Sequence, residues 1–316
     1  MISLVIPVYN ERDSLLQLHA EIAAVAAEAA LDVEVVFVDD GSRDGSWEVI
    51  RELAQQHSWT HGIRFRRNFG KAAALSAGFH GAQGEIILTL DADLQDDPHE
   101  VPRFLEALRQ DLDVVSGWKR VRLDPWHKVW PSRVFNRLVG WMTGITLHDH
   151  NCGMKCYRAE VLREVRLYGE LHRFIPVLAA ARGFRVGEIV IKHRARQHGK
   201  SKYGVRRFVK GFLDLLTVKF LTSFRQRPQH LLGTVGLLAT SMGLLGLGYL
   251  ALTWILERLM PQQGGYIRLM DRPLLIYSLA ALLLGVQLVS LGFLAELITA
   301  YQVGDEQSFS IAERTR

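Results

Sequence analysis

Two long segments without a charged residue constrain the fold of this chain more than any other feature. They cover residues 231–256 and 273–295. Each exceeds the roughly 20 apolar residues that cross the hydrocarbon core of a bilayer as a helix. Because a helix of a soluble domain usually carries a polar stripe, a long buried hairpin is the weaker interpretation. We therefore expect a two-helix transmembrane anchor over residues 229–297.

The charges that precede the first span indicate its orientation. Residues 192–227 hold eleven Lys or Arg and one acidic residue, Asp214, whereas the formal net charge of the whole chain is only +5. Basic residues next to a span stay in the cytoplasm, so we expect an integral protein of the cytoplasmic (inner) membrane with residues 1–205 and the tail 298–316 inside. The absence of a signal peptide agrees. A basic block can also bind nucleic acid, but its place beside a span favours anionic lipids.

The first 205 residues have a different pattern, in which short apolar runs alternate with helical periodicity. The runs that we interpret as buried strands are 3–8, 33–38, 62–65, 85–90 and 113–117. This alternation predicts an α/β domain with a parallel sheet and helices on both of its faces. The functional residues of such a sheet gather at the carboxyl ends of its strands.

An acidic segment, TLDADLQDDP at residues 89–98, follows the fourth expected strand. Asp91 and Asp93 are two residues apart, which places both carboxylates on the same side of an extended chain. Hard oxygen ligands of this kind suit Mg²⁺ or Mn²⁺. The alternative is a solvated turn, in which Asp97 and in part Asp96 serve the start of the next helix.

A second acidic pair, Asp39 and Asp40, follows the second expected strand. In nucleotide-binding sheets an acid at this point commonly contacts a ribose hydroxyl or a base N–H. The sequence has neither the G-x-G-x-x-G nor the G-x-x-x-x-G-K-[ST] phosphate loop. A metal ion would therefore have to neutralise the diphosphate of a bound nucleotide.

Five motifs in one order extend this interpretation: VIPVYNE, VDDGSRDGS, LDADLQDDP, DHNCGMKCYR and HRARQHGKSKYG. Together they resemble the family 2 glycosyltransferases of GT-A fold, over roughly residues 1–210. More narrowly, they are similar to the polyprenyl-phosphate glycosyltransferases, which include dolichyl-phosphate mannose synthase and undecaprenyl-phosphate sugar transferases. The resemblance implies a Rossmann-like nucleotide-sugar-binding domain at 1–205. The segment 206–228 would be amphipathic and lie in the membrane interface.

The resemblance also implies roles for single residues. The residues expected in the nucleoside pocket are Pro7, Tyr9, Glu11, Asp39 and Asp40. Those expected at the metal ion and the donor diphosphate are Asp91, Asp93, Gln95 and Arg196. Those expected at the acceptor phosphate or elsewhere on the substrates are Lys119, Arg120, Lys128, Ser132, Lys200 and Lys202.

Two of these assignments have alternatives. Family members often carry Arg where this chain has Lys119 and Lys128, and Lys supplies a point charge without a bidentate fork. A solvated loop is the other interpretation of these basic residues. Asp149 is expected to be catalytic together with Asp93, because it lies where family members carry an acid that orients the acceptor or takes a proton. An Asx-type turn is the alternative for Asp149.

The reaction that the resemblance implies is a single in-line displacement with inversion. The phosphate oxygen of an undecaprenyl or dolichyl phosphate attacks the anomeric carbon of a UDP- or GDP-sugar, and Mg²⁺ or Mn²⁺ stabilises the leaving diphosphate. A strong base is unnecessary, because a phosphate monoester is largely ionised at pH 7. The alternatives are a processive family 2 polysaccharide synthase, which would carry a Q-x-x-R-W motif and more spans, and a non-catalytic membrane adaptor, which should have lost its acids.

The two spans also carry small residues at small-xxx-small spacing. The pairs are Ala239 with Gly243 and Ala281 with Gly285. Such spacing lets helices approach closely in a membrane, and we expect it to permit a homo-oligomer.

Overall fold

The computed structural model describes residues 1–120, 126–165, 171–192, 194, 206–224, 228–259 and 272–302. The chain divides into two compact units, Met1–Lys219 and Phe220–Arg316. We call the first the catalytic unit and the second the hairpin unit. The amphipathic segment predicted at 206–228 contains α8 (Arg206–Phe224), whose residues are divided between the two units.

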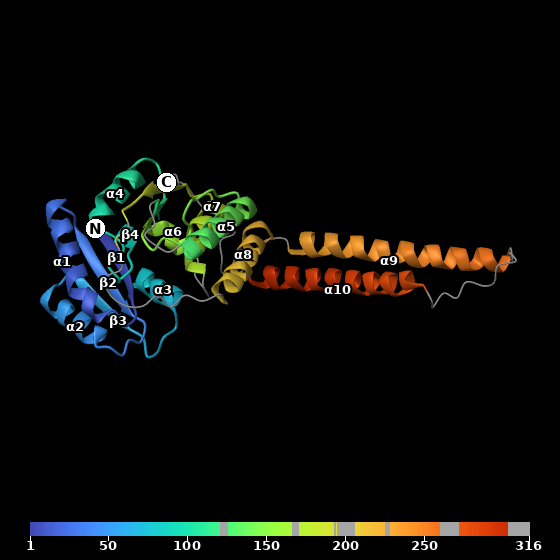
Figure 1. Ribbon diagram of the computed structural model, residues 1–316, viewed down its shortest axis with the longest axis horizontal. Helices are drawn as coiled ribbons and strands as arrows, with labels where there is room; N and C mark the ends of the chain where they lie inside the picture. Colours follow the sequence, from blue (N-terminus) through green and yellow to red (C-terminus); the bar gives the residue numbers. More distant parts are fainter. Residues whose placement is uncertain are drawn as a thin grey trace. The chain divides into compact units, whose positions relative to one another are not determined.

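The strands and helices of the catalytic unit alternate along most of the chain (Figure 1). The strands are β1 (Ile2–Val8), β2 (Val33–Asp39), β3 (Thr60–Arg64), β4 (Ile86–Thr89), β5 (Val114–Trp118), β6 (Lys155–Arg158) and β7 (Val186–Val190). The helices before α8 are α1 (Arg12–Glu28), α2 (Ser46–Gln56), α3 (Lys71–Gly81), η1 (Pro98–Glu100), α4 (Val101–Arg109), α5 (Trp126–Thr143), α6 (Ala159–Glu164), η2 (Leu171–Phe174) and α7 (Ile175–Ala181).

The seven strands of the described chain form one sheet in the order β3-β2-β1-β4-β6-β5-β7. All neighbouring strands are parallel except β6, which is antiparallel to both β4 and β5. The prediction of a parallel sheet is therefore wrong in this strand, although the α/β class is confirmed. The sequence gives little signal for β6, because KCYR begins and ends with a charged residue instead of forming an apolar run.

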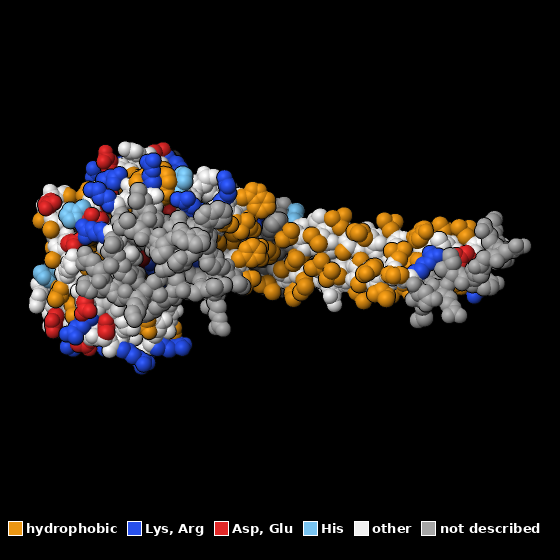
Figure 2. Space-filling model, viewed as in Figure 1, with side chains coloured by type: hydrophobic (Ala, Val, Ile, Leu, Met, Phe, Trp, Pro, Cys, Tyr) orange, Lys and Arg blue, Asp and Glu red, His pale blue; other side chains and the backbone are white. Residues whose placement is uncertain are grey.

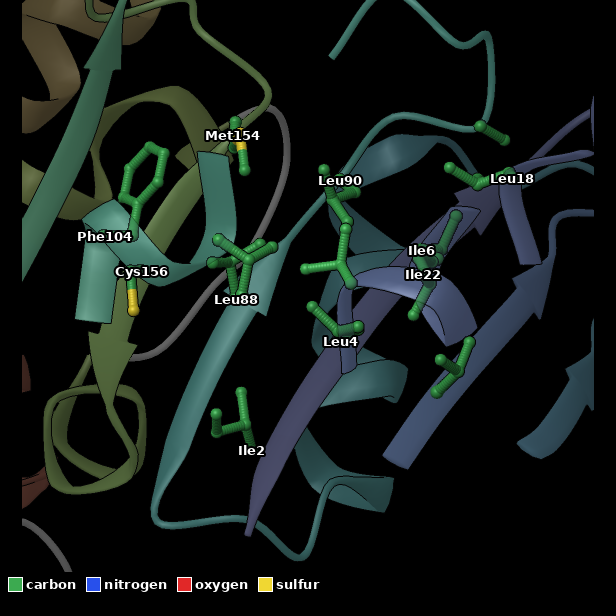
Figure 3. Close-up of a cluster of buried hydrophobic side chains, with 14 of the residues drawn as sticks. Ile2, Leu4, Ile6, Leu18, Ile22, Leu88, Leu90, Phe104, Met154 and Cys156 are labelled. Carbon is green, nitrogen blue, oxygen red and sulfur yellow. The ribbon is translucent and has the colours of Figure 1, made fainter. Parts of the chain in front are cut away.

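Helices cover both faces of the sheet, as predicted, because alternate residues of a strand point to opposite sides. Ile2, Leu4 and Ile6 of β1 belong to a core cluster that includes residues of α1, α2 and α4. Val5 belongs to a separate cluster with residues of α3. Figure 3 shows the first cluster, in which Leu18 of α1 lies beside the β1 side chains. The first five strands match the predicted apolar runs.

The hairpin unit contains α9 (Pro228–Leu259) and α10 (Pro273–Gln302). The stretches Gln229–Leu259 and Pro273–Ile298 are long and apolar enough to cross a membrane. In their most apolar windows only 17% and 11% of the residues are buried, which contradicts the alternative of a hairpin buried in a soluble core. Figure 2 shows the apolar side chains along the surface of both helices.

Small residues bring α9 and α10 into close contact. A Cβ atom on Gly236 would lie 2.8 Å from the Gly285 carbonyl oxygen, and one on Gly243 would lie 2.7 Å from the Leu282 nitrogen. Gly243 and Gly285, which suggest helix association in the sequence, therefore serve the contact within one chain. The homo-oligomer stays a prediction.

Candidate active site

The carboxyl ends of β2, β1 and β4 lie next to one another, because these strands are neighbours in the sheet. Val8 of β1 is paired with Asp39 of β2. The loops that follow are joined, since the Asn10 N–H donates to Ser42 Oγ over 2.9 Å and the Asn10 side-chain oxygen accepts the Arg43 N–H over 2.9 Å. The sheet thus brings together the segments that are predicted to form the donor site.

Asp39 and Asp40 use their carboxylates differently. The Asp39 side chain is fully buried, accepts a backbone N–H of the following turn over 2.9 Å, and lies 3.5 Å from Nε of Arg64. The Asp40 carboxylate accepts the N–H groups of Phe69 and Gly70 over 2.6 and 2.9 Å. Burial raises the pKa of Asp40, although these two hydrogen bonds oppose the rise. Asp40 therefore fixes the loop that leads into α3.

The other residues predicted for the nucleoside pocket lie at the end of β1 and just after it. Pro7 is half-buried in the strand, Tyr9 is 39% exposed, and Glu11 is half-buried immediately before α1. They share the sheet edge with Asp39, and their contact with a nucleoside stays a prediction.

The Asp91 carboxylate lies between a lysine and a glycine. Lys71, the first residue of α3, forms an ion pair with Asp91 Oδ1. On the other side, a Cβ atom on Gly153 would lie 2.5 Å from Asp91 Oδ2, so the backbone passes directly over the carboxylate. Burial opposes ionisation of Asp91, but the charges of Lys71 and Lys119 outweigh it and lower the pKa of Asp91 to about 2. Asp91 is therefore ionised at neutral pH.

Asp93 is buried in the turn that follows. Leu94 has φ of 60° there, a left-handed conformation that is uncommon for residues other than glycine. Asp93 Oδ1 accepts the Gln95 N–H over 3.2 Å, and the Gln95 carbonyl oxygen accepts the Arg194 N–H over 3.0 Å. Both backbone groups of Gln95 are thus used, and its side chain as a metal ligand stays a prediction.

Asp96 and Asp97 have separate partners. Asp97 Oδ1 accepts the His99 N–H over 3.0 Å and so caps η1, which confirms the predicted cap. Asp96 is fully buried, and its carboxylate lies 2.7 Å from the Lys119 ammonium. The interpretation of Asp96 as a residue serving the helix start is therefore wrong, because its side chain pairs with Lys119, which directly follows β5. This carboxylate raises the pKa of Lys119 in spite of burial.

Asp149 begins the segment that crosses Asp91. Its side chain is 1% exposed, and Oδ1 accepts the Asn151 N–H over 3.1 Å. Thr89 Oγ1 donates to the Gly153 carbonyl oxygen over 2.7 Å and ties the end of this segment to β4. The Asx-type turn is present, and the catalytic role of Asp149 stays a prediction.

Three residues near Asp91 are missing from the sequence interpretation: Lys71, Lys155 and His172. Lys155 is buried, and its ammonium donates to the carbonyl oxygens of His150, over 3.2 Å, and Cys152. Burial and the charge of Lys71 lower the pKa of His172 well below its ordinary value, so its imidazole is neutral at pH 7. The sequence carries one signal that singles out Lys71: it is a cation at the expected start of a helix, where the helix dipole disfavours positive charge.

Asp91 and Asp93 carry the carboxylate oxygens that a hard divalent cation prefers. The ammonium of Lys71 already lies on Asp91 Oδ1, and Gly153 places no side chain against Oδ2. Another group, Glu21, Asp97 and His99, also brings three ligand atoms within 4.8 Å of one another. Arg194 already neutralises that group, since its guanidinium lies 2.6 Å from Glu21 and 2.7 Å from Asp97. Both groups thus already have a basic partner, and Asp91 with Asp93 stays the predicted ligand pair.

Several predicted substrate-binding residues cannot be placed at this site. Arg196, Lys200 and Lys202 lie outside the described residues, and the side chain of Lys128 in α5 lies outside them as well. Arg120 is exposed just after β5, and Ser132 is half-buried in α5. Their roles stay predictions.

The largely parallel sheet with acidic residues at the carboxyl ends of its strands is typical of a glycosyltransferase domain of GT-A fold. Residues 3–166 match the model of glycosyl transferase family 2. The chain belongs to this family, which confirms the predicted resemblance and the transferase class.

The relatives point to one group within the family. The dodecaprenyl-phosphate galacturonate synthase of Rhizobium johnstonii is 37% identical over 97% of this chain and 90% of its own length. The undecaprenyl-phosphate 4-deoxy-4-formamido-L-arabinose transferase of Aeromonas hydrophila is 36% identical over 94% of this chain and 88% of its own. Both names match the polyprenyl-phosphate group predicted from the sequence.

A solved structure confirms the GT-A-like fold. Glucosyl-3-phosphoglycerate synthase from Mycobacterium tuberculosis, in complex with Mn²⁺, UDP and phosphoglyceric acid, superimposes with a TM-score of 0.55. The match covers 70% of this chain and 78% of that one at 16% identity.

Proposed function

We propose that this chain transfers one sugar from a UDP- or GDP-linked donor to a polyprenyl phosphate, with inversion at the anomeric carbon. The observation that carries the proposal is the half-buried Asp91 carboxylate, 32% exposed at the sheet edge where β1, β2 and β4 end, with Asp93 two residues further along the chain. A chain with this edge and two membrane-crossing helices is suited to join a soluble donor to a lipid acceptor. The two relatives named above support the same acceptor class.

Asp91 and Asp93 hold Mg²⁺ or Mn²⁺, with Gln95 as a further ligand. The metal ion, when bound, supplies Lewis-acid stabilisation of the leaving diphosphate. Asp39 receives the nucleoside, together with Pro7, Tyr9 and Glu11. Asp40 keeps the loop before α3 in place by accepting two of its N–H groups. Arg196 adds a guanidinium at the diphosphate.

The acceptor phosphate approaches from the side of Lys119, Lys128 and Ser132, with Arg120, Lys200 and Lys202 as further cations. Its oxygen attacks without a strong base, since the monoester is already largely ionised. Asp149 orients the acceptor or takes a residual proton. The freedom of the Lys119 side chain is restricted, because its ammonium is also paired with Asp96.

The site works at the cytoplasmic face of the inner membrane. The basic block at 192–227 supports this orientation. Phe212, Leu213 and Leu216 of α8 are exposed apolar residues in the catalytic unit, which suits a helix that lies in the membrane interface. A polyprenyl phosphate presents its phosphate at the same depth.

The test is a transfer assay with the full chain in lipid nanodiscs. A panel of radiolabelled UDP- and GDP-sugars is offered with undecaprenyl phosphate and Mg²⁺ or Mn²⁺, and one combination is expected to give lipid that carries a single sugar. Asp91→Asn should abolish the product, whereas Asp111→Asn should leave it unchanged, since Asp111 is 79% exposed at the other edge and its ion pair contributes little. If no combination labels the lipid, the proposal is wrong, and a polymeric product would indicate a processive synthase.

A further inference from the structure

Three lysines surround Asp91, and they differ in what holds them. Lys119 has a side chain that is 14% exposed and lies 2.7 Å from the buried Asp96 carboxylate. Lys155 is buried and donates to two backbone carbonyl oxygens. Lys71 pairs directly with Asp91, and its side chain is 36% exposed. Of the three side chains, that of Lys71 is therefore the most accessible to solvent.

The backbone that carries Lys71 is fixed, whereas its side chain is the most exposed of the three lysines. The loop before α3 is held by the two hydrogen bonds to Asp40. Further along α3, Gly78 packs against Val38, because a Cβ atom there would lie 3.3 Å from its side chain. The ammonium of lysine is a strongly hydrated point charge on a four-carbon stem. Lys71 can thus change partners without a movement of its helix.

The Asp91 carboxylate cannot bind the Lys71 ammonium and a divalent cation at full strength at the same time. Both cations need the same carboxylate, and like charges a few ångströms apart repel each other strongly in a half-buried site. Lys119 and Lys155 add positive charge around Asp91, whereas the neutral imidazole of His172 adds no charge. A bare divalent cation therefore meets a carboxylate that is already neutralised. A diphosphate changes this balance, because it brings negative charge to which an ammonium can transfer.

We propose that Lys71 exchanges partners when the donor binds: it neutralises Asp91 in the free enzyme and contacts the donor diphosphate once a divalent cation holds Asp91. The inference rests on the proposed function, since it takes the ligand to be a nucleoside diphosphate bound with a metal ion. The exchange makes the metal ion and the nucleoside diphosphate bind cooperatively. It also accounts for a lysine at the first position of α3, where the helix dipole disfavours a cation.

The experiment measures Mn²⁺ binding to the full chain by the electron paramagnetic resonance signal of free Mn²⁺, first without nucleotide. Lys71→Met should bind Mn²⁺ about tenfold more tightly than the wild type, the change expected when a charged hydrogen-bond partner stops competing. With saturating Mn²⁺, the affinity of the same variant for UDP or GDP should fall by about tenfold. Lys192→Met is the matched control, because Lys192 is exposed and has no place in the site.

Lys71→Arg gives a second measurement that does not depend on the folding of the first variant. A guanidinium holds a carboxylate through two hydrogen bonds, so this variant should bind Mn²⁺ more weakly than the wild type. Mn²⁺ affinity that is unchanged or lower in Lys71→Met, or unchanged in Lys71→Arg, would overturn the exchange. If the expected shifts occur but no sugar reaches lipid in the transfer assay, the exchange at Asp91 stands and the proposed acceptor is wrong.

Discussion

Gly153→Ala tests whether the approach of this backbone to Asp91 matters for transfer. The new methyl group would lie 2.5, 2.7 and 2.9 Å from Oδ2, Cγ and Oδ1 of Asp91. All three separations are well inside the roughly 3.5 Å at which carbon atoms normally meet their neighbours. The carboxylate must therefore retreat by about 1 Å. A displacement of this size at a catalytic group costs about 100-fold in rate, and the overpacking costs about 1–3 kcal/mol of stability.

The assay compares the initial rate of sugar transfer to lipid and the Mn²⁺ affinity with the melting temperature in detergent. Gly140→Ala is the control, because a Cβ atom at Gly140 would come no nearer than 3.5 Å to its neighbours and Gly140 lies within α5. Transfer should fall in Gly153→Ala far more than the melting temperature predicts, and both should stay near wild type in the control. Wild-type transfer and Mn²⁺ affinity in Gly153→Ala would refute the role given to Asp91.

Three further predictions concern other parts of the chain. Asp93→Asn should nearly abolish transfer, because it removes a carboxylate from the metal site, while the melting temperature stays within a few degrees; wild-type turnover would contradict the metal role. Burial and the charge of His57 lower the pKa of His19 to about 4, so the folded state takes up its proton less readily than the unfolded chain. The contribution of neutral His19 to the free energy of unfolding is complete above the ordinary pKa of about 6.5 and is lost as the pH falls toward 4. Urea unfolding in detergent should therefore show that this free energy decreases by up to about 3 kcal/mol. His19→Gln should reduce this loss, and an unchanged acid profile would contradict it. Gly243→Leu should lower the melting temperature by separating α9 from α10, whereas Gly248→Leu should not, because Gly248 faces open space; equal effects would contradict the packing.

The sequence predicts those parts of the fold that depend on local pattern. The first five strands are apolar runs in the chain, and the two spans are uncharged over more than 20 residues. The position of β6 does not follow from such a pattern. It depends on pairing between Thr89 and Lys155, 66 residues apart, and its short segment carries charge at both ends. The predicted topology fails at this strand for that reason.

The same distinction holds within the site. The placement of Asp39 and Asp91 at the same edge of the sheet follows from the predicted parallel strands, and the structure adds that these two strands flank β1. The cap formed by Asp97 is local and follows from its place before Pro98. The partners Lys71 and Lys119 are 20 and 23 residues from Asp91 and Asp96, across loops whose path the sequence does not give. Sequence therefore indicates which acids gather, but not which cations they meet.

Those cations decide which acids are available for chemistry. The Asp96 side chain is 0% exposed and its lysine is 14% exposed, so an incoming cation can replace Lys119 at Asp96 only by disrupting the core. The Asp91 side chain is 32% exposed and its lysine 36% exposed, so the same kind of ion pair can open there at little cost in buried surface. Two carboxylates five residues apart, each paired with lysine, thus have different functions, because one pair stabilises the fold and the other can be replaced by a metal ion and a diphosphate.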